Sequence, residues 1–291
     1  MGRMRRTGMG KRTGVAGRTT RSKLLPSAPR RRIIAPHPGE ESVLPEVRDR
    51  LLDLNRQFYI SSVQDFDQTR RQVWPGLLSC SDLLARHARH PAAVLDAGCG
   101  NGRILVWLHG LLSLARYTGL DSNRSMLQFA AGRAGRLAVP VPILDFVEAD
   151  LALDAWPDRL PATVQYDLVL CLATLHHLPG LELRRRAMAG FGSCLRSGGL
   201  LVLSNWQPSR SPRERAKFLD WADAGLTETD VEEGDRLVAW RRGRRAMRYV
   251  HETTAAEMDW LGEHAGCRNL FHRRADGVDG HLNLYSVYTR S

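Results

Sequence analysis

The spacing of apolar residues changes along the chain and predicts helices first, then alternating strands and helices. From residue 45 onward apolar side chains recur every three or four positions, at Val47, Leu51, Leu54 and Phe58. A polar stretch follows, Trp74-Pro75 interrupts the pattern, and residues 77–88 form a second helical segment. Both helices precede the other elements, and we expect them to cover a ligand at the edge of a sheet.

From residue 92 a short apolar run, a turn and an apolar helix alternate. Strands are expected at 93–96, 117–121, 143–147, 166–172 and 199–205, with helices at 104–114, around 126–130 and at 184–195. This alternation is typical of a parallel sheet with helices on both faces. Two more strands, 269–273 and 282–289, are joined by a tight connection and should form an antiparallel pair. The pattern therefore predicts an α/β fold with a doubly wound, mostly parallel seven-stranded sheet whose last strand is antiparallel.

Charge divides the chain into a basic tail and a neutral remainder. The net charge of the 291 residues is +11, and residues 1–39 hold eleven basic and no acidic side chains. The remaining chain carries 31 of each sign, so the whole-chain charge is weak support for nucleic-acid binding by a folded surface. Residues 1–42 contain few apolar side chains, and we expect them to be disordered. They could be an arm attracted to phosphates, an organelle transit peptide or an upstream extension that is seldom translated.

Composition excludes several classes of protein. Hydrophobic residues make up 43% of the chain, enough for a sizeable core. The longest apolar stretch, 104–115, is too short for a membrane helix, and no apolar segment follows the basic start as a secretory signal requires. The five cysteines are far apart, so neither a metal site nor a disulfide framework follows. We expect a cytoplasmic protein without a membrane partner, or a protein of an organelle matrix if the tail is a transit peptide.

Three glycines directly after the first predicted strand indicate a nucleotide-binding turn. Gly98, Gly100 and Gly102 allow a sharp turn and a close approach of a ligand to the backbone. Asp121 ends the next strand, where its carboxylate can accept hydrogen bonds from both ribose hydroxyls, and Asp150 ends the third, within reach of an adenine amino group. A dinucleotide site would more often read Gly-x-Gly-x-x-Gly. No Gly-x-x-x-x-Gly-Lys-Ser/Thr motif occurs, so hydrolysis of a nucleoside triphosphate is unsupported.

With these acids in place, residues 92–205 resemble the class I S-adenosylmethionine-dependent methyltransferases. The motifs that carry the resemblance are Asp96-Ala-Gly-Cys-Gly-Asn-Gly102, Gly119-Leu-Asp121, Glu148-Ala-Asp150, Tyr166-Asp-Leu-Val-Leu170 and Leu195-Arg-Ser-Gly-Gly199. Their order and spacing match the motifs of that superfamily. The resemblance implies a Rossmann-like methyltransferase fold, formed by a domain at 92–291 behind N-terminal helices at 43–91.

The same resemblance assigns roles to residues of the cofactor site. The methionine moiety of S-adenosyl-L-methionine would lie along Asp96 and a loop of Gly98, Cys99, Gly100, Asn101 and Gly102. Asp121 with Ser122 would hold the ribose, and Asp150 with Leu151 the adenine. Cys171, Ala173 and Leu175 would flank the sulfonium.

Shorter motifs outside this core resemble the tRNA wobble-uridine carboxymethyl methyltransferases. They are Phe58-Tyr59, Asp65-Phe66-Asp67-Gln68-Thr69-Arg70, Trp74-Pro75, Leu175-His176-His177-Leu178, Arg185-Arg186, Asn205-Trp206, Gly234-Asp235, Trp240, Arg248-Tyr249-Val250-His251 and Asn283-Leu284-Tyr285. That family methylates the carboxylate of 5-carboxymethyluridine in the anticodon loop. The resemblance implies tRNA as a partner and a small zinc-binding activator subunit as a second one. Leu-His-His-Leu is also found in many small-molecule methyltransferases.

The chemistry of carboxylate methylation selects the candidate catalytic residues. A carboxylate is ionised at neutral pH and needs no general base, so the enzyme must orient an oxygen and balance charge. Arginine suits this task because its planar fork binds two carboxylate oxygens at once. The candidates are Arg70, Arg244, Arg245 and Arg248, with His176, His177, Tyr249 and His251 as hydrogen-bond donors. A purely structural role for the adjacent histidines fits the sequence equally well.

The segment 207–253, an insertion at the usual place for substrate recognition, separates its charges. Residues 220–235 carry seven acids and no Lys or Arg, whereas 236–251 carry six arginines and no acid. The basic half could contact RNA phosphates, with Trp240 or Tyr249 stacking on an unpaired base. Alternatively, the two halves pair as a solvated charged hairpin. We favour methylation of a modified tRNA uridine. The alternatives are a methyltransferase for a small-molecule carboxylate, hydroxyl or quinone, and a non-catalytic partner that binds the cofactor.

Overall fold

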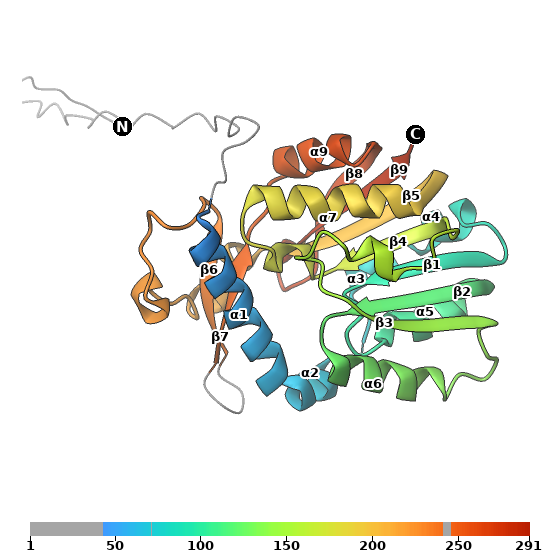
Figure 1. Ribbon diagram of the computed structural model, residues 1–291, viewed down its shortest axis with the longest axis horizontal. Coiled ribbons are helices and arrows are strands. Elements are labelled where there is room, and N and C mark those ends of the chain that lie inside the picture. Colours follow the sequence, from blue (N-terminus) through green and yellow to red (C-terminus); the bar gives the residue numbers. More distant parts are fainter. Residues whose placement is uncertain (1–42, 71, 241–245) are drawn as a thin grey trace, which may run out of the picture. The chain divides into compact units, whose positions relative to one another are not determined.

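The computed structural model describes residues 43–70, 72–240 and 246–291. The predicted disordered tail at 1–42 lies outside these ranges. Figure 1 shows a central sheet flanked by helices, with a separate two-stranded hairpin beside the first helix. None of the helices in the described ranges is long and apolar enough to cross a membrane.

Seven strands form the central sheet in the order β3-β2-β1-β4-β5-β9-β8. They are β1 (Ala92–Ala97), β2 (Leu114–Asp121), β3 (Ile143–Glu148), β4 (Tyr166–Leu172), β5 (Leu195–Trp206), β8 (Cys267–Ala275) and β9 (Asn283–Arg290). Neighbours from β3 to β5 pair in parallel, whereas β9 is antiparallel to both β5 and β8. The predicted α/β fold with an antiparallel last strand is confirmed. The turn expected at 197–199 lies inside β5, where the pairing register with β4 shifts.

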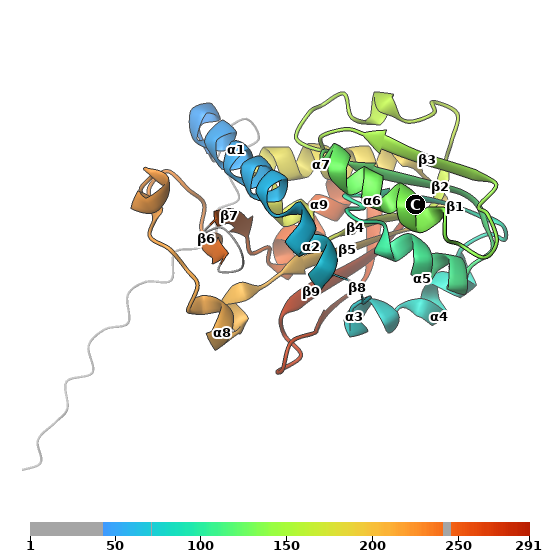
Figure 2. The same cartoon turned by 90° about the horizontal axis from the view of Figure 1, so that it is seen from below.

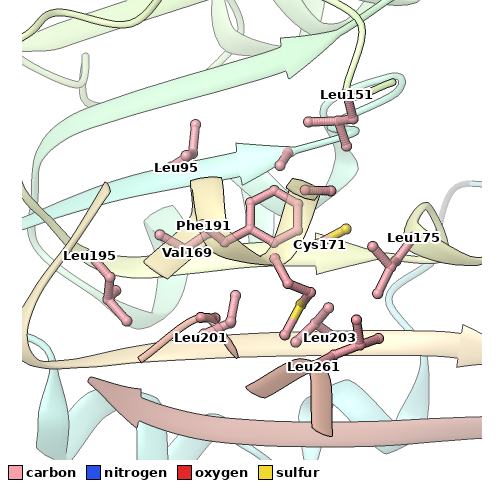
Figure 3. Close-up of a cluster of buried hydrophobic side chains, with 14 of the residues drawn as sticks. Leu95, Leu151, Val169, Cys171, Leu175, Phe191, Leu195, Leu201, Leu203 and Leu261 are labelled. Atoms are coloured by element: carbon pink, nitrogen blue, oxygen red, sulfur yellow. The ribbon is translucent and has the colours of Figure 1, made fainter. Parts of the chain in front are cut away.

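Side chains of each strand alternate between the two faces of the sheet, and each face has its own core. On β4, Val169 and Cys171 belong to the core under α7 (Leu181–Cys194) and α9 (Ala255–His264) (Figure 3). Leu168 and Leu170 of the same strand belong to the core on the opposite face. The helices of that opposite face are α3 (Pro75–Leu78), α4 (Ser81–His87), α5 (Arg103–Leu111) and α6 (Arg124–Ala134).

The sheet reverses its strand order between β1 and β4. From β1 the chain proceeds outward to β2 and β3 on one side, then returns to β4 and β5 on the other. In doubly wound sheets the loops at the carboxyl ends of the strands diverge at this point and leave a crevice. The glycine loop at 98–102 follows β1, and η2 (Leu175–His177) follows β4, so both lie where a ligand is expected.

The segment 207–253 forms a group of short elements between β5 and α9. It contains η3 (Pro208–Arg210), α8 (Pro212–Arg215), η4 (Trp221–Ala224) and the antiparallel strands β6 (Asp235–Trp240) and β7 (Ala246–His251). Apart from Asp235, both strands come from the basic half of the segment. The acidic half is therefore not the strand partner of the basic half, contrary to the alternative of two paired halves.

The first helix, α1 (Pro45–Ser61), packs on this hairpin. Leu51 of α1 shares a core with Trp221, Leu237 and Tyr249. Asn55 binds the backbone of β7 at two points, accepting the Tyr249 N–H at 2.8 Å and donating to the Tyr249 carbonyl at 3.1 Å. Figure 2 shows α1 beside the hairpin, with α2 (Val63–Thr69) continuing toward α6. This arrangement carries the N-terminal helices past the carboxyl edge of the sheet.

Candidate active site

A cavity of about 1170 Å³ lies at the carboxyl edge of the sheet. The N-terminal helices, the loops after β1 to β4, the hairpin and α8 all contribute to its lining. The predicted cofactor residues that line it are Asp96, Gly98, Cys99, Gly100, Asn101, Asp121, Ser122, Asp150, Leu151 and Ala173. Ten of the thirteen are thus brought to one cavity by the described chain. Leu175 does not line it, because its side chain is fully buried in the core under α7 and α9.

The glycine loop has the backbone that a closely approaching ligand requires. Gly98, Gly100 and Gly102 have φ angles of +78°, +52° and +74°, a region that residues with a side chain rarely adopt. A Cβ on Gly100 would have only Phe66 within 4 Å, at 3.9 Å, so the backbone here faces open space. The loop therefore leaves room for the methionine half of the predicted cofactor.

Gly102 and Cys171 do not line the cavity. A Cβ on Gly102 would come within 2.8 Å of Ala130, so this glycine allows α5 to pack closely on α6. Cys171 is fully buried in the core under α7 and α9, because its position on β4 points it to that face. Their predicted contact with the cofactor is replaced by packing roles.

Asp121 is arranged to accept hydrogen bonds. Its two carboxylate oxygens accept the Gly100 N–H at 2.9 Å and the Asn123 N–H at 2.8 Å, which leaves lone pairs directed elsewhere for the two ribose hydroxyls. Burial raises the pKa of Asp121 to about 6, against the lowering effect of these backbone donors. Asp96 has a pKa raised to about 6 for the same reason and accepts the Tyr117 hydroxyl at 2.7 Å. The remaining acceptor positions of Asp121 thus fit the ribose hydroxyls of a bound nucleoside.

Asp150 forms an ion pair with the first helix. Its Oδ2 lies 3.0 Å from Arg56 Nη2, and its Oδ1 accepts the Ala152 N–H at 2.9 Å. Both Asp150 and Arg56 line the cavity. This ion pair joins α1 to the end of β3, although the two elements are far apart in the sequence, and it closes this end of the cavity.

The two adjacent histidines line the cavity in neutral form. His177 Nδ1 lies 3.0 Å from the Tyr249 carbonyl and must donate to it, so its Nε2 accepts the Tyr59 hydroxyl at 2.7 Å. Burial and the nearby Arg248 lower the pKa of His177 to about 3. Burial also lowers the pKa of His176, whose Nδ1 accepts the Trp206 N–H at 3.2 Å. Neither ring titrates near neutral pH, as a general base would.

Arg248 lines the cavity, and its guanidinium is surrounded by three aromatic rings. Its Cζ lies 4.4 Å from the centre of the Trp206 ring, 5.3 Å from Phe58 and 5.6 Å from Trp240. The Nε atom is shielded from solvent and has no hydrogen-bond partner among the described residues. Burial lowers the pKa of this guanidinium, whereas a hydrogen bond to Tyr59 raises it. In the part of the chain that the structure covers, no carboxylate forms an ion pair with it.

Tyr249 and His251, which were predicted with Arg248, face away from the cavity. Side chains of β7 alternate, so Arg248 lies on the cavity side while its neighbours Tyr249 and His251 share the other side. Tyr249 is fully buried and donates to Asp235 at 2.8 Å, so it is not accessible for stacking on a base. Trp240, the other predicted stacking residue, does line the cavity.

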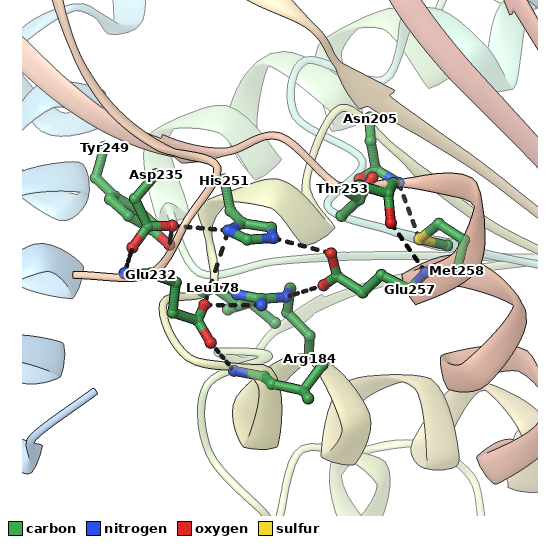
Figure 4. A network of polar contacts seen from close by, with 12 residues as sticks. Leu178, Arg184, Asn205, Glu232, Asp235, Tyr249, His251, Thr253, Glu257 and Met258 are labelled. Atoms are coloured by element: carbon green, nitrogen blue, oxygen red, sulfur yellow. Dashed lines mark hydrogen bonds and ion pairs between the residues drawn. The ribbon is translucent and has the colours of Figure 1, made fainter. Parts of the chain in front are cut away.

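His251 belongs to a buried polar network that sequence reasoning missed (Figure 4). Its two nitrogens contact Asp235 at 2.7 Å and Glu257 at 2.9 Å, and the fully buried Arg184 bridges Glu257 and Glu232 at 2.8 Å each. Glu232, Asp235 and His251 are close enough together for a metal site. Arg184 and a protonated His251 already supply positive charge to these acids, and we assign the cluster a structural role.

Arg70 of the N-terminal helices also reaches the cavity, together with Tyr59, Phe66 and Trp74. The arginines predicted at 241, 242, 244 and 245 lie outside the described residues. Arg236 does not line the cavity and instead forms an ion pair with Glu252 at 3.4 Å. Among the predicted catalytic residues, the cavity therefore brings together Arg70, His176, His177 and Arg248.

Arg103 is a cavity residue that was not predicted. It follows Gly102 directly and its guanidinium lies 4.0 Å from the centre of the Trp74 ring. The signal in the sequence is a single arginine at the start of the otherwise apolar run 104–108.

Comparison with known proteins identifies the domain around this cavity. Residues 95–201 match a family described as a methyltransferase domain. A putative methyltransferase from Encephalitozoon cuniculi is 29% identical over 195 residues, covering 67% of this chain and 78% of that protein. A trans-aconitate 2-methyltransferase from Streptomyces avermitilis is 40% identical over 103 residues, covering 34% of this chain and 36% of that protein.

A solved structure shows the same fold. The 1,6-didemethyltoxoflavin N1-methyltransferase from Burkholderia thailandensis, crystallised with S-adenosylhomocysteine, matches with a TM-score of 0.57 at 20% identity. The match covers 85% of this chain and 91% of that chain. None of these three proteins is named as a tRNA methyltransferase, so these comparisons give no support to the predicted wobble-uridine subgroup.

Proposed function

We propose that the chain is a class I S-adenosylmethionine-dependent methyltransferase that methylates a carboxylate oxygen of a small organic acid. S-adenosyl-L-methionine is the methyl donor. The acceptor is the open question, and the relatives named as trans-aconitate 2-methyltransferases favour a small molecule. A small-molecule acceptor was the alternative to tRNA in the sequence analysis, and it fits the comparisons better than tRNA does.

The observation that carries the proposal is the environment of Arg248. A guanidinium with a shielded, unpartnered Nε and no ion pair among the described residues is costly to maintain in an aromatic wall. An acceptor carboxylate would supply two oxygens to its planar fork. The neutral histidines support the same assignment, because a hydroxyl acceptor would need a base that titrates near neutral pH.

The residues of the chain orient and shield the acceptor in this proposal. S-adenosylmethionine supplies an electrophilic methyl group when it is bound to the glycine loop and Asp121. Arg248 holds the acceptor carboxylate, and Tyr59 fixes Arg248 because its hydroxyl is held in turn by His177. Phe58, Trp206 and Trp240 keep water from the guanidinium. Orientation of this kind can lower a barrier by about 7–11 kcal/mol.

The test is methyl transfer from labelled S-adenosylmethionine to trans-aconitate and other small di- and monocarboxylic acids. We expect label in a methyl ester, which mild alkali hydrolyses to labelled methanol. A labelled product that survives alkali would indicate a hydroxyl or amine acceptor and contradict the proposal. Protein with Asp121→Asn serves as the negative control, because it retains Arg248.

A second candidate acceptor is 5-carboxymethyluridine in tRNA. The specific observation in its favour is that the motifs resembling the wobble-uridine enzymes converge on this cavity, through Phe66, Arg70, Trp74, Trp206 and Trp240. The same assay with tRNA carrying carboxymethyluridine, digested to nucleosides, tests it. Ester on the nucleoside but on none of the free acids would replace the first candidate with the second. A zinc-binding activator subunit remains a proposal tied to this second candidate.

A further inference from the structure

A second guanidinium in the cavity is as well shielded as Arg248. Arg103 is only 8% exposed, although it stands at the first position of α5, and it lines the cavity wall. Its Cζ lies 4.0 Å from the centre of the Trp74 ring. A guanidinium held against an aromatic ring can still present its N–H edge to a partner.

No partner for this edge is found in the chain that the structure covers. Arg103 Nε is buried without a hydrogen bond, and no carboxylate of the described residues forms an ion pair with the side chain. Burial and the charge of Arg70 lower its pKa to about 10, while Asp96 acts in the opposite direction. The side chain therefore stays charged at neutral pH, and no carboxylate of the described residues is in direct contact with that charge.

Neighbouring arginines differ from Arg103 in this respect. Arg133, which lies on the next helix, forms an ion pair with Asp67 at 2.6 Å and does not line the cavity. Arg56 pairs with Asp150. Arg103 and Arg248 share the unusual combination of a shielded Nε, a tryptophan under the guanidinium and a place in the cavity wall.

We propose that Arg103, held against Trp74, forms a second carboxylate site of the cavity, separate from Arg248. A carboxylate could come from either of two molecules. The amino-acid half of S-adenosylmethionine carries one, and Asp96, which is coupled electrostatically to Arg103, would suit the ammonium group beside it. The other source is a carboxylate of an acceptor that has two acid groups, and this source rests on the proposed function.

Binding measurements separate these sources without requiring methyl transfer. The variants are Arg103→Gln, Arg103→Lys and, as the control for loss of one positive charge, Arg133→Gln. Calorimetry gives the affinity of each for S-adenosylhomocysteine and for 5′-methylthioadenosine, which lacks the amino-acid group. Trans-aconitate and the monocarboxylate crotonate are then titrated into protein saturated with S-adenosylhomocysteine. Thermal unfolding shows whether each variant is folded. If Arg103→Gln is not folded, Arg103→Lys takes its place in the comparison.

Loss of a charge-assisted pair should weaken binding by about 10- to 100-fold. A cofactor carboxylate predicts this loss for S-adenosylhomocysteine in Arg103→Gln, with unchanged affinity for 5′-methylthioadenosine. An acceptor carboxylate predicts it for trans-aconitate alone, with S-adenosylhomocysteine unaffected. The proposal is overturned if Arg103→Gln binds every ligand as the unaltered protein does, or if Arg133→Gln shows the same losses. Since none of these readouts is methylation, failure of the proposed function would leave the cofactor arm intact.

Discussion

Arg248 is the residue whose replacement should separate acceptor binding from cofactor binding. Arg248→Gln removes the fork and the charge, so we expect the KM for the acceptor to rise about 10- to 100-fold. Arg248→Lys keeps the charge without the planar fork and should recover only part of the loss. The affinity for S-adenosylhomocysteine, measured by calorimetry, should stay unchanged in both.

The matched control is Arg236→Gln on the neighbouring strand of the hairpin. Arg236 pairs with Glu252 and lies outside the cavity, so this change removes the same charge from the same small sheet. An equal rise in KM for Arg236→Gln would show that the hairpin acts through its net charge and not through Arg248.

Asp121 should make cofactor binding depend on pH. Its pKa is raised to about 6 by burial, so the carboxylate loses its proton as the pH rises from 5 to 7. A hydroxyl donates best to the ionised form, and we therefore expect tighter binding of S-adenosylhomocysteine at pH 7 than at pH 5. Asp121→Asn should weaken binding about 10- to 100-fold at pH 7 and flatten this dependence.

Asp145→Asn removes an acid from the edge strand β3, where Asp145 pairs with Arg116, and controls for charge alone. Asp96 also has a pKa near 6 and would leave a residual pH dependence in Asp121→Asn. Equal slopes for Asp121→Asn and the unaltered protein would assign the dependence to Asp96 and contradict this prediction.

Residue types and strand ends were enough to predict which residues of the glycine loop and of the strand ends meet at the cavity. Gly98, Gly100 and Asp121 follow strands whose carboxyl ends meet, so their spacing in the sequence was enough. The acceptor side was harder, because the choice between Arg248 and its neighbours depends on which face of β7 each occupies. That face is decided by packing on α1, about 190 residues away in the chain, through the hydrogen bonds of Asn55.

At the scale of elements, the seven strands of the sheet were predictable and several smaller elements were not. The helix expected at 77–88 is two helices, because the hydroxyls of Ser79 and Ser81 donate to carbonyls at 2.7 and 2.6 Å and compete with the helical pattern. α9 carries little amphipathic signal, although Met258 and Leu261 are fully buried. The hairpin was not predicted, because β6 is continuously apolar from Leu237 to Trp240 and lacks the alternation that marks a half-buried strand.

Gly102 lies between β1 and α5, and replacing it tests whether glycine is needed there for α5 to pack on α6. Ala at this position must adopt a φ of +74° and also press against Ala130, whose nearest atoms would lie 2.8 Å from the new Cβ. We expect Gly102→Ala to lower the free energy of unfolding by about 2–4 kcal/mol, measured by urea denaturation. Gly266→Ala, where φ is +66° and nothing lies within 4 Å, should cost only about 1–2 kcal/mol for the backbone.

The comparison isolates the packing contribution, because both glycines are left-handed and only Gly102 is crowded. Similar losses for the two variants would mean that α6 moves aside freely. In that case the close approach of α5 and α6 would not explain why glycine is needed at residue 102.

At the scale of the whole described chain, the network around Arg184 joins parts that are distant in sequence. Arg184 comes from α7, Glu257 from α9, and Glu232, Asp235, Tyr249 and His251 from the segment 207–253. It therefore fixes the hairpin that carries Arg248 to the helices that cover the sheet. No pattern in the sequence predicts this network, because its five charged residues are spread over more than 70 positions and resemble ordinary surface residues until the fold buries them.

This network should make stability depend on pH through His251. Burial and Arg184 lower the pKa of His251, but the Glu257 charge and hydrogen bonds to Asp235 and Glu257 outweigh them and raise it to about 9. An ordinary histidine has a pKa of about 6.5, so the protonated ring stabilises the fold fully below pH 6.5 and loses that contribution as the pH rises through 9. The shift corresponds to at most about 3 kcal/mol. Asp96 and Asp121 are half-titrated near pH 6 and are largely ionised above pH 7, so they contribute little to the slope there.

Burial raises the pKa of all five cysteines, so their thiols also make both the unaltered protein and His251→Gln less stable as the pH approaches 9. We therefore expect the free energy of unfolding to fall between pH 7 and 9 in both, and to fall less steeply in His251→Gln than in the unaltered protein. His264→Gln removes a histidine of α9 that lies outside the network, with its Nδ1 2.8 Å from the Trp260 carbonyl and its ring packed on the Trp260 ring, and should retain the full slope. Urea denaturation at matched ionic strength gives all three curves. Parallel curves for the unaltered protein and His251→Gln would mean that His251 is neutral in the fold. Arg184 alone would then balance the acids Glu232, Asp235 and Glu257. The structural role assigned to Glu232, Asp235 and His251 would then have to be weighed against binding of a metal ion.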